Sequence, residues 1–379
     1  MKPARVAFVV NNLDVGGLEK VVISLLTKLD RMQFDPQLIC LNGEGKLFCE
    51  AKLASEATLV LEKRERSYLG LNLDLSALAA IRQFVRQRSI RLIHAHNAAP
   101  LIYSGISSRT LSRRPHVIYT EHNQIYSASD TAKKKFRFYL KLADSVISVS
   151  HDLANALRLS AGWRRPIEVI HNGVDGQIFG MGRREKVRAE LGVGDGTFLV
   201  GAGVVLSQQK GISYLIEAAQ RVCARCPRAM FVIAGDGPLR SELETLGQQS
   251  GLGARLRFLG FRNDMPEFIA ALDLYVLPSL WEGLPLALCE ALAVGKPIVC
   301  TKVGGSSEVV VDGVNGYVVP AADPLALSAA ILKVSEEPAL SEMYSKCNRS
   351  RFEQHFSDHA MIAAHEALYR RLLDRSPEN

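Results

Sequence analysis

The sequence predicts an α/β protein built from two doubly wound domains, each a parallel sheet with helices on both faces. Its length of 379 residues is greater than a single hydrophobic core usually spans. Short, nearly continuous apolar runs alternate with segments whose apolar residues recur at helical spacing, which is typical of parallel strands buried on both faces. This alternation occurs twice, on either side of a polar, glycine-rich stretch at residues 173–196, so two domains joined there are expected.

The strands of the first domain are the apolar runs before this stretch. They lie at residues 4–10, 36–41, 91–96, 116–122, 145–150 and 167–172. Helical spacing of apolar residues, at residues 18–29 and 75–88, predicts covering helices between them. We therefore assign residues 1–175 to the first domain.

The second domain repeats the pattern over residues 176–357. Its strands are expected at residues 198–205, 230–235, 256–260, 274–279 and 297–301. Residues 358–379 carry apolar positions at helical spacing and predict a C-terminal helix.

Composition is that of an ordinary globular protein, with 47% hydrophobic and 22% charged residues. No run approaches the roughly 18 apolar residues of a membrane-spanning helix. The first apolar run leads into a polar glycine loop, which indicates a strand and not a cleaved signal peptide. The seven scattered cysteines predict reduced core residues of a cytosolic protein. Cys223 and Cys226 have no second pair at zinc-site spacing, so buried thiols are expected there.

Charge is unevenly distributed along the chain. Residues 1–178 hold 25 Lys and Arg against 16 Asp and Glu, a net of +9, whereas residues 179–379 hold 21 against 23, a net of −2. This asymmetry indicates either an anionic partner of the first domain or simply a solvated basic surface. Nucleic-acid binding fits poorly, because the basic residues are not interleaved with aromatic residues in a recognisable module.

Ligands of open α/β sheets bind beyond the carboxyl ends of the strands, so we looked for functional residues there. Gly16 and Gly17 follow the first strand, where a backbone without side chains and a helix start suit an anion, although a plain turn explains them equally. His122 ends the strand at 116–122, either as an acid, base or sugar contact or as a satisfied core histidine. His94 and His96 share one strand face, but no nearby residues complete a metal site.

Two charged positions follow strands of the second domain. Lys210 lies at the mouth of a predicted helix and is suited to pairing with phosphate, although the surrounding residues are not a Walker loop. Glu282 follows the strand at 274–279, where it is better suited to neutral hydroxyls than to a phosphate that would repel it.

The helix expected after Glu282 starts with backbone amide groups that can bind a diphosphate, aided by the helix dipole. The residues offering them are Gly283, Leu284 and Leu286. Glu290 lies about two turns further on, within reach of two ribose hydroxyls. The alternative is an ordinary helix with an acidic start and one further glutamate.

Several segments together resemble the glycosyltransferases of family 4 type, which have the GT-B fold. They are EGLPLALCE at residues 282–290, the following GKPIVCTKVGGSSEVVVDGVNGYVV, the preceding FLGFRNDMPEFIAALDLYVLPS, Lys210-Gly211, and Asn172 to Asp175. The resemblance covers nearly the whole chain. It implies two Rossmann-like domains facing a central cleft, the first on the acceptor side and the second binding a nucleotide sugar. The C-terminal helix is then expected to cross back to the first domain.

The same resemblance implies a retaining transferase that moves a sugar from a nucleotide-diphosphate sugar to a glycan or lipid-linked acceptor in cell-surface polysaccharide or glycoconjugate synthesis. No metal or other cofactor is expected, and the sequence has no D-x-D motif.

Residue roles are also implied by the resemblance. His122 would contact the transferred sugar, Lys210 would neutralise the leaving diphosphate, and Glu282 would bind sugar hydroxyls near the anomeric carbon; these are the expected catalytic residues. Further donor contacts would come from Gly16, Gly17, the 283–286 backbone and Glu290. The pair Gly304-Gly305 would shape the neighbouring loop.

One position departs from the family pattern. The resemblance implies an arginine soon after Gly203, where this chain has Val204, and no arginine lies between Phe198 and Lys210. Losing such a charge-assisted contact costs about 1.5–3 kcal/mol. A non-catalytic or weakly active nucleotide-sugar-binding protein is therefore the main alternative. An epimerase would not require the paired glutamates, and a glycogen-phosphorylase-like enzyme would require a longer chain and a pyridoxal lysine.

Residues 132–143 suggest how the acceptor side could meet a membrane. One helical stripe is basic and the next is apolar; the members are Lys133, Arg137 and Lys141, then Phe136, Tyr139, Leu140 and Ala143. Such a helix either lies on an anionic bilayer or packs its aromatic residues on its own sheet. A cytoplasmic protein, peripheral at the inner face of the membrane, is the corresponding expectation.

Overall fold

The computed structural model describes residues 2–14, 16–63, 67–68, 71–122 and 130–374. The chain divides into two compact units. Unit 1 comprises residues 1–171 and 361–379, and unit 2 comprises residues 172–360. The boundaries predicted from the sequence lie after residue 175 and at residue 358.

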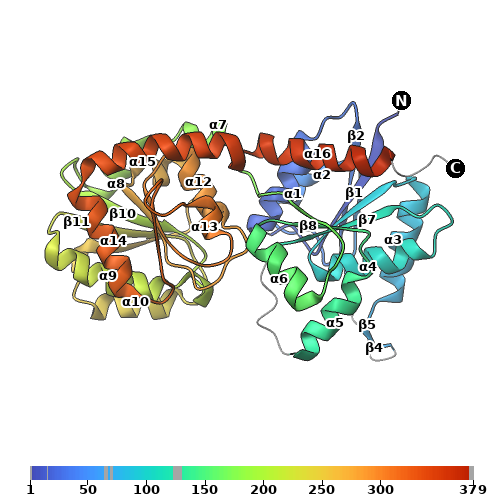
Figure 1. The fold of residues 1–379 in the computed structure, drawn as a ribbon, viewed down its shortest axis with the longest axis horizontal. Coiled ribbons are helices and arrows are strands. Elements are labelled where there is room, and N and C mark those ends of the chain that lie inside the picture. Colours follow the sequence, from blue (N-terminus) through green and yellow to red (C-terminus); the bar gives the residue numbers. More distant parts are fainter. Residues whose placement is uncertain (1, 15, 64–66, 69–70, 123–129, 375–379) are drawn as a thin grey trace. The chain divides into compact units, whose positions relative to one another are not determined.

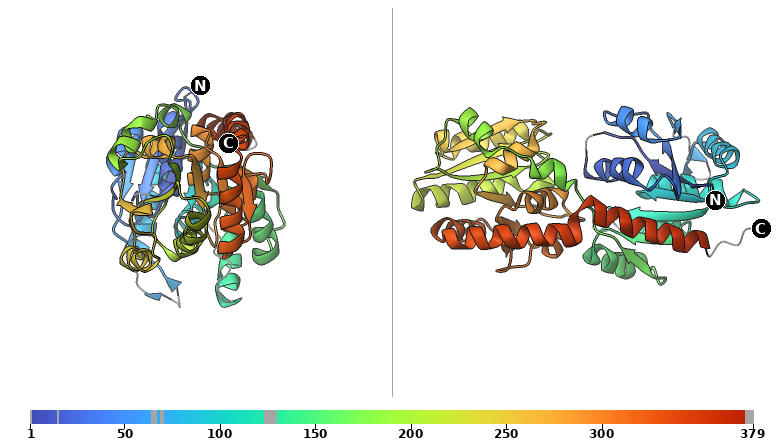
Figure 2. Two further views of the ribbon diagram at one scale, coloured as in Figure 1. Left: turned by 90° about the vertical axis from the view of Figure 1, so that its left-hand side faces the viewer. Right: turned by 90° about the horizontal axis from the view of Figure 1, so that it is seen from above.

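Unit 1 contains a seven-stranded parallel sheet in the order β3-β2-β1-β6-β7-β8-β9. Its strands are β1 (Ala4–Val10), β2 (Phe34–Cys40), β3 (Ala57–Val60), β6 (Leu92–His96), β7 (His116–Glu121), β8 (Ser145–Ser148) and β9 (Ile167–Val169). A separate antiparallel pair joins β4 (Ser67–Tyr68) to β5 (Leu71–Asn72). The central strands β1, β6 and β7 are almost wholly buried, whereas the edge strand β3 is half-buried. Helices lie on both faces of the sheet (Figures 1 and 2).

The helices of unit 1 follow the strands in alternation. They are α1 (Gly17–Lys28), α2 (Phe48–Ala54), α3 (Leu75–Gln87), α4 (Ala98–Arg109), α5 (Asp130–Leu140) and α6 (His151–Ala161), together with most of α16 (Asp358–Asp374). Asp74 caps α3 by accepting hydrogen bonds from two first-turn amide groups, and Gly162 ends α6 in the left-handed conformation. The ring of Tyr369 on α16 packs edge-on against Phe34 of β2, so the end of the chain belongs to this core.

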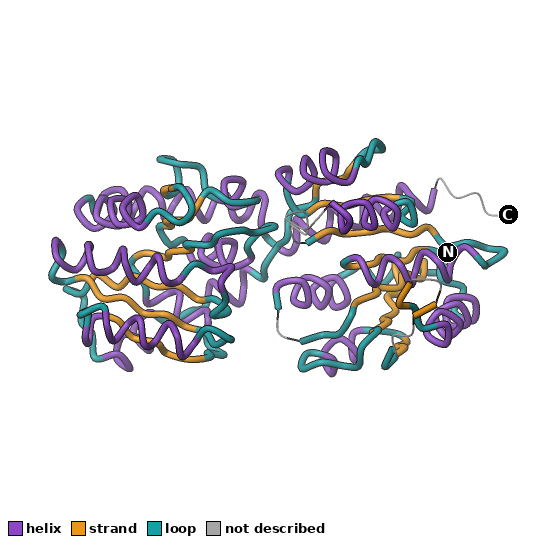
Figure 3. The backbone as a smooth tube through the Cα atoms, turned by 90° about the horizontal axis from the view of Figure 1, so that it is seen from below, coloured by secondary structure: helices purple, strands orange, loops and turns teal. Residues whose placement is uncertain are grey.

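Unit 2 contains a six-stranded parallel sheet in the order β12-β11-β10-β13-β14-β15. Its strands are β10 (Phe198–Gly203), β11 (Ala229–Ala234), β12 (Leu256–Gly260), β13 (Leu274–Leu277), β14 (Ile298–Thr301) and β15 (Tyr317–Val319). Helices cover both faces of each sheet (Figure 3). Those of unit 2 are α7 (Gly176–Gly180), α8 (Arg184–Leu191), α9 (Ile212–Arg225), α10 (Arg240–Gln249), α11 (Met265–Ala271), α12 (Leu286–Val294), α13 (Ser306–Val309), α14 (Pro324–Glu336) and α15 (Pro338–Arg351), with short turns η2 (Gln208–Lys210), η3 (Gly253–Arg255) and η4 (Phe352–Phe356).

Both sheets reverse their strand order at one place. In unit 1 the first strand, β1, lies between β2 and β6, and in unit 2 β10 lies between β11 and β13. At such a switch point the loops leaving two neighbouring strands diverge to opposite faces, which opens a crevice at the carboxyl edge of the sheet. The fold therefore marks the β1–β6 edge and the β10–β13 edge as places for ligands.

The predicted fold class is confirmed, and each strand expected from the sequence is present. Two strands of the main sheets, β3 and β15, were not predicted, because their apolar runs are short. The stretch expected to be a linker, residues 173–196, was wrongly interpreted: it holds α7 and α8, and Val187 and Leu191 of α8 are buried.

The cysteines agree only partly with the expectation of core residues. Cys40, Cys223, Cys226, Cys289 and Cys300 are buried thiols, but Cys49 is exposed and Cys347 is half-buried. Among the described residues, no helix has the length and apolar character needed to cross a membrane.

Candidate functional site

The switch point of unit 2 brings together the loops that follow β10 and β13. These strands pair in parallel, with Val200 beside Leu274 and Gly201 beside Tyr275, so both end at the same edge of the sheet. The loop after β10 ends in η2 and Lys210. The loop after β13 carries Glu282 and leads into α12.

Lys210 and Glu282, 72 positions apart in sequence, form an ion pair at this edge. The Lys210 Nζ lies 2.6 Å from Glu282 Oε1, and both side chains are largely buried, with 17% and 6% exposed. The hydroxyl of Ser279 donates to the same carboxylate oxygen at 2.6 Å, and Gln209 Nε2 donates to the other oxygen at 3.3 Å. The glutamate is thus held in one orientation by three donors.

The turn at Gly211 fixes Lys210 against the second loop. Gly211 has φ +60, and a Cβ atom there would lie 2.2 Å from the Pro278 carbonyl oxygen. Leu280 N donates to Gln209 O at 2.7 Å, and Gln209 Nε2 donates to Trp281 O at 2.9 Å. Only glycine allows this close approach, which sets the position of the lysine relative to the glutamate.

A third loop, at Gly304-Gly305, supports the start of α12. Gly304 has φ +49, and a Cβ atom there would lie 2.0 Å from Glu282 O. Gly305 N donates to Gly283 O at 2.7 Å. In the part of the chain that the structure describes, the amide groups of Gly283, Leu284 and Leu286 make no hydrogen bond. They remain available to an anion at the positive end of the helix dipole. These are the three amide groups that the sequence suggested for a diphosphate.

Glu290 lies on the same face of α12 as Leu286, four residues further along, and is only 5% exposed. Tyr275 of β13 lies near this carboxylate. Burial, and secondarily the charge of Glu290, raise the pKa of the tyrosine. The structure therefore places Glu290 within α12, where Tyr275 senses its charge more strongly than that of Glu282.

Val204 stands at the position expected to carry an arginine, and its neighbour Val205 differs from it in exposure. Val204 N donates to Ala234 O at 2.9 Å, and its side chain packs on the core of unit 2. Val205 is 55% exposed. A long basic side chain at this strand end would fit at Val205, whereas at Val204 it would disturb the core.

The switch point of unit 1 carries His122, Gly16 and Gly17. Gly16 is the N-cap of α1 in an extended conformation, and the Glu19 side chain folds back over it. Burial raises the pKa of Glu19 above its usual value. The start of α1 thus faces a half-buried acid of its own first turn, a feature the sequence analysis did not anticipate.

His122 is 7% exposed and contacts His96 at the end of β6. His122 Nε2 and His96 Nδ1 lie 2.9 Å apart, and the two rings are stacked. Among the described residues, His122 Nδ1 and His96 Nε2 have no hydrogen-bond partner. His122 is therefore not a satisfied core histidine. Burial lowers its pKa to about 3, so the ring is neutral near neutral pH.

His94 forms hydrogen bonds within the core through both of its ring nitrogens. Its Nδ1 lies 2.7 Å from the Tyr369 hydroxyl of α16, and its Nε2 lies 2.6 Å from Thr120 Oγ1. Both ring nitrogens are thus occupied, which removes the pairing of His94 with His96 as metal ligands. Burial lowers the pKa values of His94 and of the neighbouring His365, the latter to about 4.

Three polar residues beside the predicted ones were missed: Gln209, Ser279 and, as a partner of His122, His96. Gln209 and Ser279 give no local sequence signal, because polar residues are common in loops. For His96 the signal was its place at the end of a strand next to the one that carries His122.

The helix α5 packs its apolar stripe on its own sheet. Phe136, Leu140 and Ala143 are buried, and the Phe136 ring contacts Tyr119 of β7. Of the basic stripe, Arg137 and Lys141 are exposed, while the Lys133 side chain lies outside the described residues. An apolar side chain that does face solvent is Phe138, 63% exposed.

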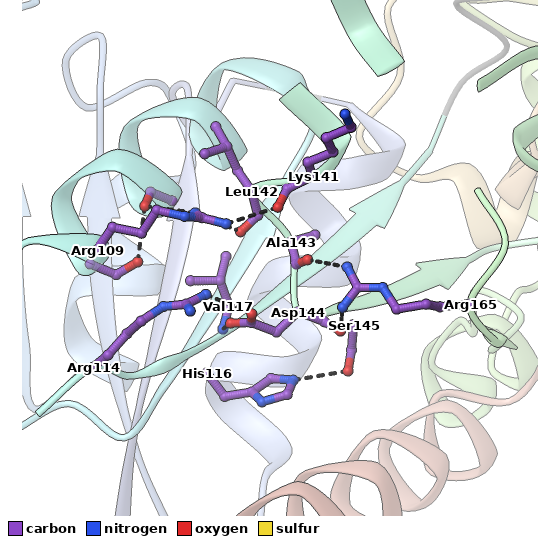
Figure 4. A network of polar contacts seen from close by, with 12 residues as sticks. Arg109, Arg114, His116, Val117, Lys141, Leu142, Ala143, Asp144, Ser145 and Arg165 are labelled. Carbon is purple, nitrogen blue, oxygen red and sulfur yellow. Dashed lines mark hydrogen bonds and ion pairs between the residues drawn. The ribbon is translucent and has the colours of Figure 1, made fainter. Parts of the chain in front are cut away.

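Part of the basic excess of unit 1 stabilises the turn that follows α5 (Figure 4). Arg109 donates to the carbonyl groups of Lys141 and Leu142 at 2.8 and 3.1 Å, and Arg165 donates to that of Ala143 at 2.6 Å. Hydrogen bonds with a charged donor are stronger than those between neutral groups, so they hold this turn in place. These arginines therefore have a structural role as well as contributing charge.

Comparison with known families assigns both halves of the chain. The glycosyltransferase family 4 description matches residues 15–177, and the glycosyl transferases group 1 description matches residues 183–351. A relative from Escherichia coli, UDP-Gal:alpha-D-GlcNAc-diphosphoundecaprenol alpha-1,3-galactosyltransferase, is 27% identical over 88% of both chains. The N-acetyl-alpha-D-glucosaminyl L-malate synthase of Bacillus anthracis is 23% identical over 78% of both.

Solved structures give the same picture of the fold. A glycosyltransferase from Rickettsia africae matches with a TM-score of 0.87 over 99% of this chain and 100% of that chain, at 18% identity. Anabaena Alr3699/HepE, solved in complex with UDP-glucose, matches with a TM-score of 0.83 at 25% identity, over 97% of this chain and 99% of that chain.

Proposed function

Because the chain belongs to the GT-B glycosyltransferases of family 4 type, we propose that it transfers a sugar, with retention at the anomeric carbon, from a nucleotide-diphosphate sugar to a glycan or lipid-linked acceptor. We place this reaction in the synthesis of a cell-surface polysaccharide or glycoconjugate. The observation that carries the proposal is the Lys210–Glu282 pair beside the unbonded amide groups of α12.

The donor diphosphate binds to these amide groups and to Lys210. A lysine ammonium has three donors, and Glu282 Oε1 takes one, so Lys210 can hold the carboxylate and a phosphate together. Glu282 then accepts hydrogen bonds from hydroxyl groups of the transferred sugar, and Glu290 accepts them from the ribose hydroxyl groups. For unit 1, we propose that His122 contacts a sugar hydroxyl and that Gly16 and Gly17 leave space for a phosphate and the acceptor.

In the proposed reaction, the bond from the anomeric carbon to the diphosphate breaks as the acceptor oxygen approaches from the same side. The departing phosphate accepts the acceptor's proton, so no carboxylate acts as a covalent nucleophile. Lys210 and the start of α12 stabilise the negative charge that develops on the leaving group. Positive charge from these groups takes the place of a metal ion, so we propose a metal-independent enzyme.

A test of the function combines donor selection with stereochemistry. Thermal-shift measurements with UDP, GDP and ADP sugars should select one nucleotide, and NMR of the product should show that the donor's anomeric configuration is retained. Turnover should persist in EDTA. An inverted product or dependence on a divalent ion would overturn the proposed mechanism; failure to bind any nucleotide sugar would overturn the function.

The acceptor is proposed to be lipid-linked, supported by the name of the Escherichia coli relative, which acts on a diphosphoundecaprenol-linked sugar. The membrane contact would be α5, through its exposed residues Lys134, Lys135, Arg137, Phe138 and Lys141. The protein would then be cytoplasmic and peripheral at the inner face of the membrane. The protein should sediment with vesicles that contain anionic lipid, and added salt should release it. The double substitution Lys134→Glu and Lys135→Glu should weaken this binding. Equal recovery from neutral and anionic vesicles would contradict the membrane contact.

A second function is supported by Val204, which stands where an arginine is expected. A nucleotide-sugar-binding protein without turnover would use the same Lys210 and Glu282 contacts. Donor consumption that depends on added acceptor distinguishes the transferase from this alternative.

A further inference from the structure

The carboxyl edge of the unit 1 sheet collects buried polar atoms that have no partner. Across the described part of unit 1, six buried side-chain nitrogen or oxygen atoms lack a hydrogen bond. Four of them belong to residues that end or follow β1, β6 and β7: Asn11 Oδ1, His96 Nε2, Asn97 Oδ1 and His122 Nδ1. Native proteins leave few buried polar atoms unpaired, so a group of four at one edge requires an explanation.

The strand register places these residues next to one another. Val9 of β1 pairs with Ala95 of β6, so Asn11 and Asn97 each follow two residues later. His96 pairs with Thr120 of β7, two residues before His122. The same strands satisfy their polar groups one step back from the edge, where His94 bonds to both Thr120 and Tyr369. Among the described residues, the unpaired atoms of β1, β6 and β7 and the residues after them therefore lie at the carboxyl edge, by the switch point where the fold opens a ligand crevice.

The two histidines determine what the edge can bind. One hydrogen lies between His96 Nδ1 and His122 Nε2. Whichever ring donates it, the remaining nitrogens of the two neutral rings have opposite character, one carrying a hydrogen and one not. The edge thus presents one N–H donor, one nitrogen acceptor and two amide oxygen acceptors. A hydroxyl group can donate and accept, whereas an ionised phosphate or carboxylate can only accept.

Asn97 supports a binding role through its backbone. It has φ +76 and is the N-cap of α4, yet its side chain makes no capping hydrogen bond. Asparagine is a favoured N-cap because its oxygen usually satisfies a helix amide. Here Asn97 adopts a sparsely populated conformation while its Oδ1 is buried and unbonded, as expected for a residue held for a ligand.

We propose that Asn11, His96, Asn97 and His122 form a subsite for the adjacent hydroxyl groups of a neutral sugar ring. This deepens the proposed function and rests on it: the ring is either the acceptor sugar or the sugar carried by the donor. The subsite selects hydroxyls by pairing donors with acceptors, without a charged side chain. Asn11, His96 and Asn97 are thereby binding residues in addition to His122.

The experiment follows the histidine ring nitrogens of the full-length protein by NMR. Methyl glycosides of glucose, galactose and N-acetylglucosamine are titrated alone and with UDP, then UDP-glucose is titrated, and inorganic phosphate serves as the charged comparison. At least one sugar ligand should shift the His96 and His122 ring nitrogens, and phosphate should not. A response to a methyl glycoside assigns the acceptor sugar, and a response to UDP-glucose only assigns the donor sugar. A response to phosphate, or to no sugar, overturns the proposal.

Variants separate binding from folding. Asn97→Gly should weaken the sugar response about tenfold, the factor for one lost neutral hydrogen bond, without a loss of thermal stability, because glycine accepts φ +76. His96→Phe should do the same and also change the His122 resonance without ligand. Ser104→Ala is the matched control: Ser104 Oγ is another buried unpaired atom of unit 1, but it lies within α4, so the sugar response should be unchanged. An equal loss in this control would contradict the subsite.

Failure of the subsite is distinguishable from failure of the proposed function. Stabilisation by UDP-glucose that is lost in Lys210→Ala tests only the contacts of unit 2. If that stabilisation is present while the histidine resonances stay unchanged in every titration, the function stands and the subsite is wrong.

Discussion

The switch points of units 1 and 2 have the same topology but opposite chemistry. At the β10–β13 edge, Lys210 and Glu282 form an ion pair, and among the described residues the amide groups of Gly283, Leu284 and Leu286 make no hydrogen bond. At the ends of β1, β6 and β7, the side chains of Asn11, His96, Asn97 and His122 are uncharged, and one buried polar atom of each is unpaired among the described residues. The strand order decides where a ligand can bind, whereas the side chains at the strand ends decide whether it is an anion or a neutral hydroxyl compound.

The largest expected effect comes from removing the charge of Glu282 or of Lys210. Glu282→Gln and Lys210→Met should each lower kcat/KM about 10²–10³-fold, because each removes a fixed charge that acts on the reacting groups. Steady-state kinetics with the selected nucleotide sugar measures this. The control is Glu342→Gln, which breaks the exposed Lys346–Glu342 pair and should leave the rate unchanged. Near-normal rates in both site variants would show that the assigned roles are wrong.

A second substitution tests the same edge of the unit 2 sheet by adding a cation. Val205→Arg should raise kcat/KM by about one to two decades, since a charge-assisted hydrogen bond contributes about 1.5–3 kcal/mol. Val204→Arg should instead lower stability, because Val204 packs on the unit 2 core while Val205 is 55% exposed. Kinetics and thermal unfolding of the pair distinguish the two positions. An unchanged rate in a well-folded Val205→Arg variant would show that the leaving group needs no further cation.

A third comparison tests the turn that positions Lys210. Gly211 and Gly192 are both left-handed, with φ +60 and +65, but a Cβ atom meets Pro278 O only at Gly211. Gly192→Ala should cost about 1 kcal/mol from backbone strain alone. Gly211→Ala should cost about 2–3 kcal/mol and also lower kcat/KM, because the clash moves Lys210 away from Glu282. Equal effects of the two substitutions on denaturant unfolding and on rate would contradict this account.

The smallest expected effect is a pH dependence of the free energy of unfolding in unit 1. Burial lowers the pKa of His365 to about 4 in the folded protein, below the ordinary value near 6.5. Between pH 6.5 and 4 the unfolded chain therefore binds the proton that the folded chain rejects, so the free energy of unfolding falls as pH falls through this window. The slope is up to about 1.4 kcal/mol per pH unit for each such histidine.

This pH dependence can be measured on unit 1 by itself. Of the two tryptophans, Trp163 lies in unit 1 and Trp281 in unit 2, so Trp281→Phe leaves a fluorescent reporter of unit 1. In that background, urea unfolding at pH 7 and pH 5 should show a smaller pH difference in His365→Gln than in the parent. Ser104→Ala should retain the parent's slope. A parent whose stability does not change with pH would disprove that the ring is buried in its neutral form.

Local sequence patterns were sufficient for the architecture. Apolar runs, helical spacing and glycine turns depend on residues a few positions apart, and they located strands such as β1 and β12 at the bounds seen in the structure. The position after a strand marked Lys210, Glu282 and His122 as candidates, because topology places every strand end of a parallel sheet at one edge. Short runs without such patterns, including α7 and α8, were missed.

The pairing of side chains was decided only by the tertiary structure. Lys210 meets Glu282 across 72 positions, and His94 meets Tyr369 across 275. The sequence paired His94 with His96 on one strand face, yet packing against α16 occupies both ring nitrogens of His94, whereas a ring nitrogen of His96 and one of His122 stay unpaired. The physical reason is that a hydrogen bond depends on the distance and direction of two groups in space. No spacing along the chain determines these once the groups belong to different elements.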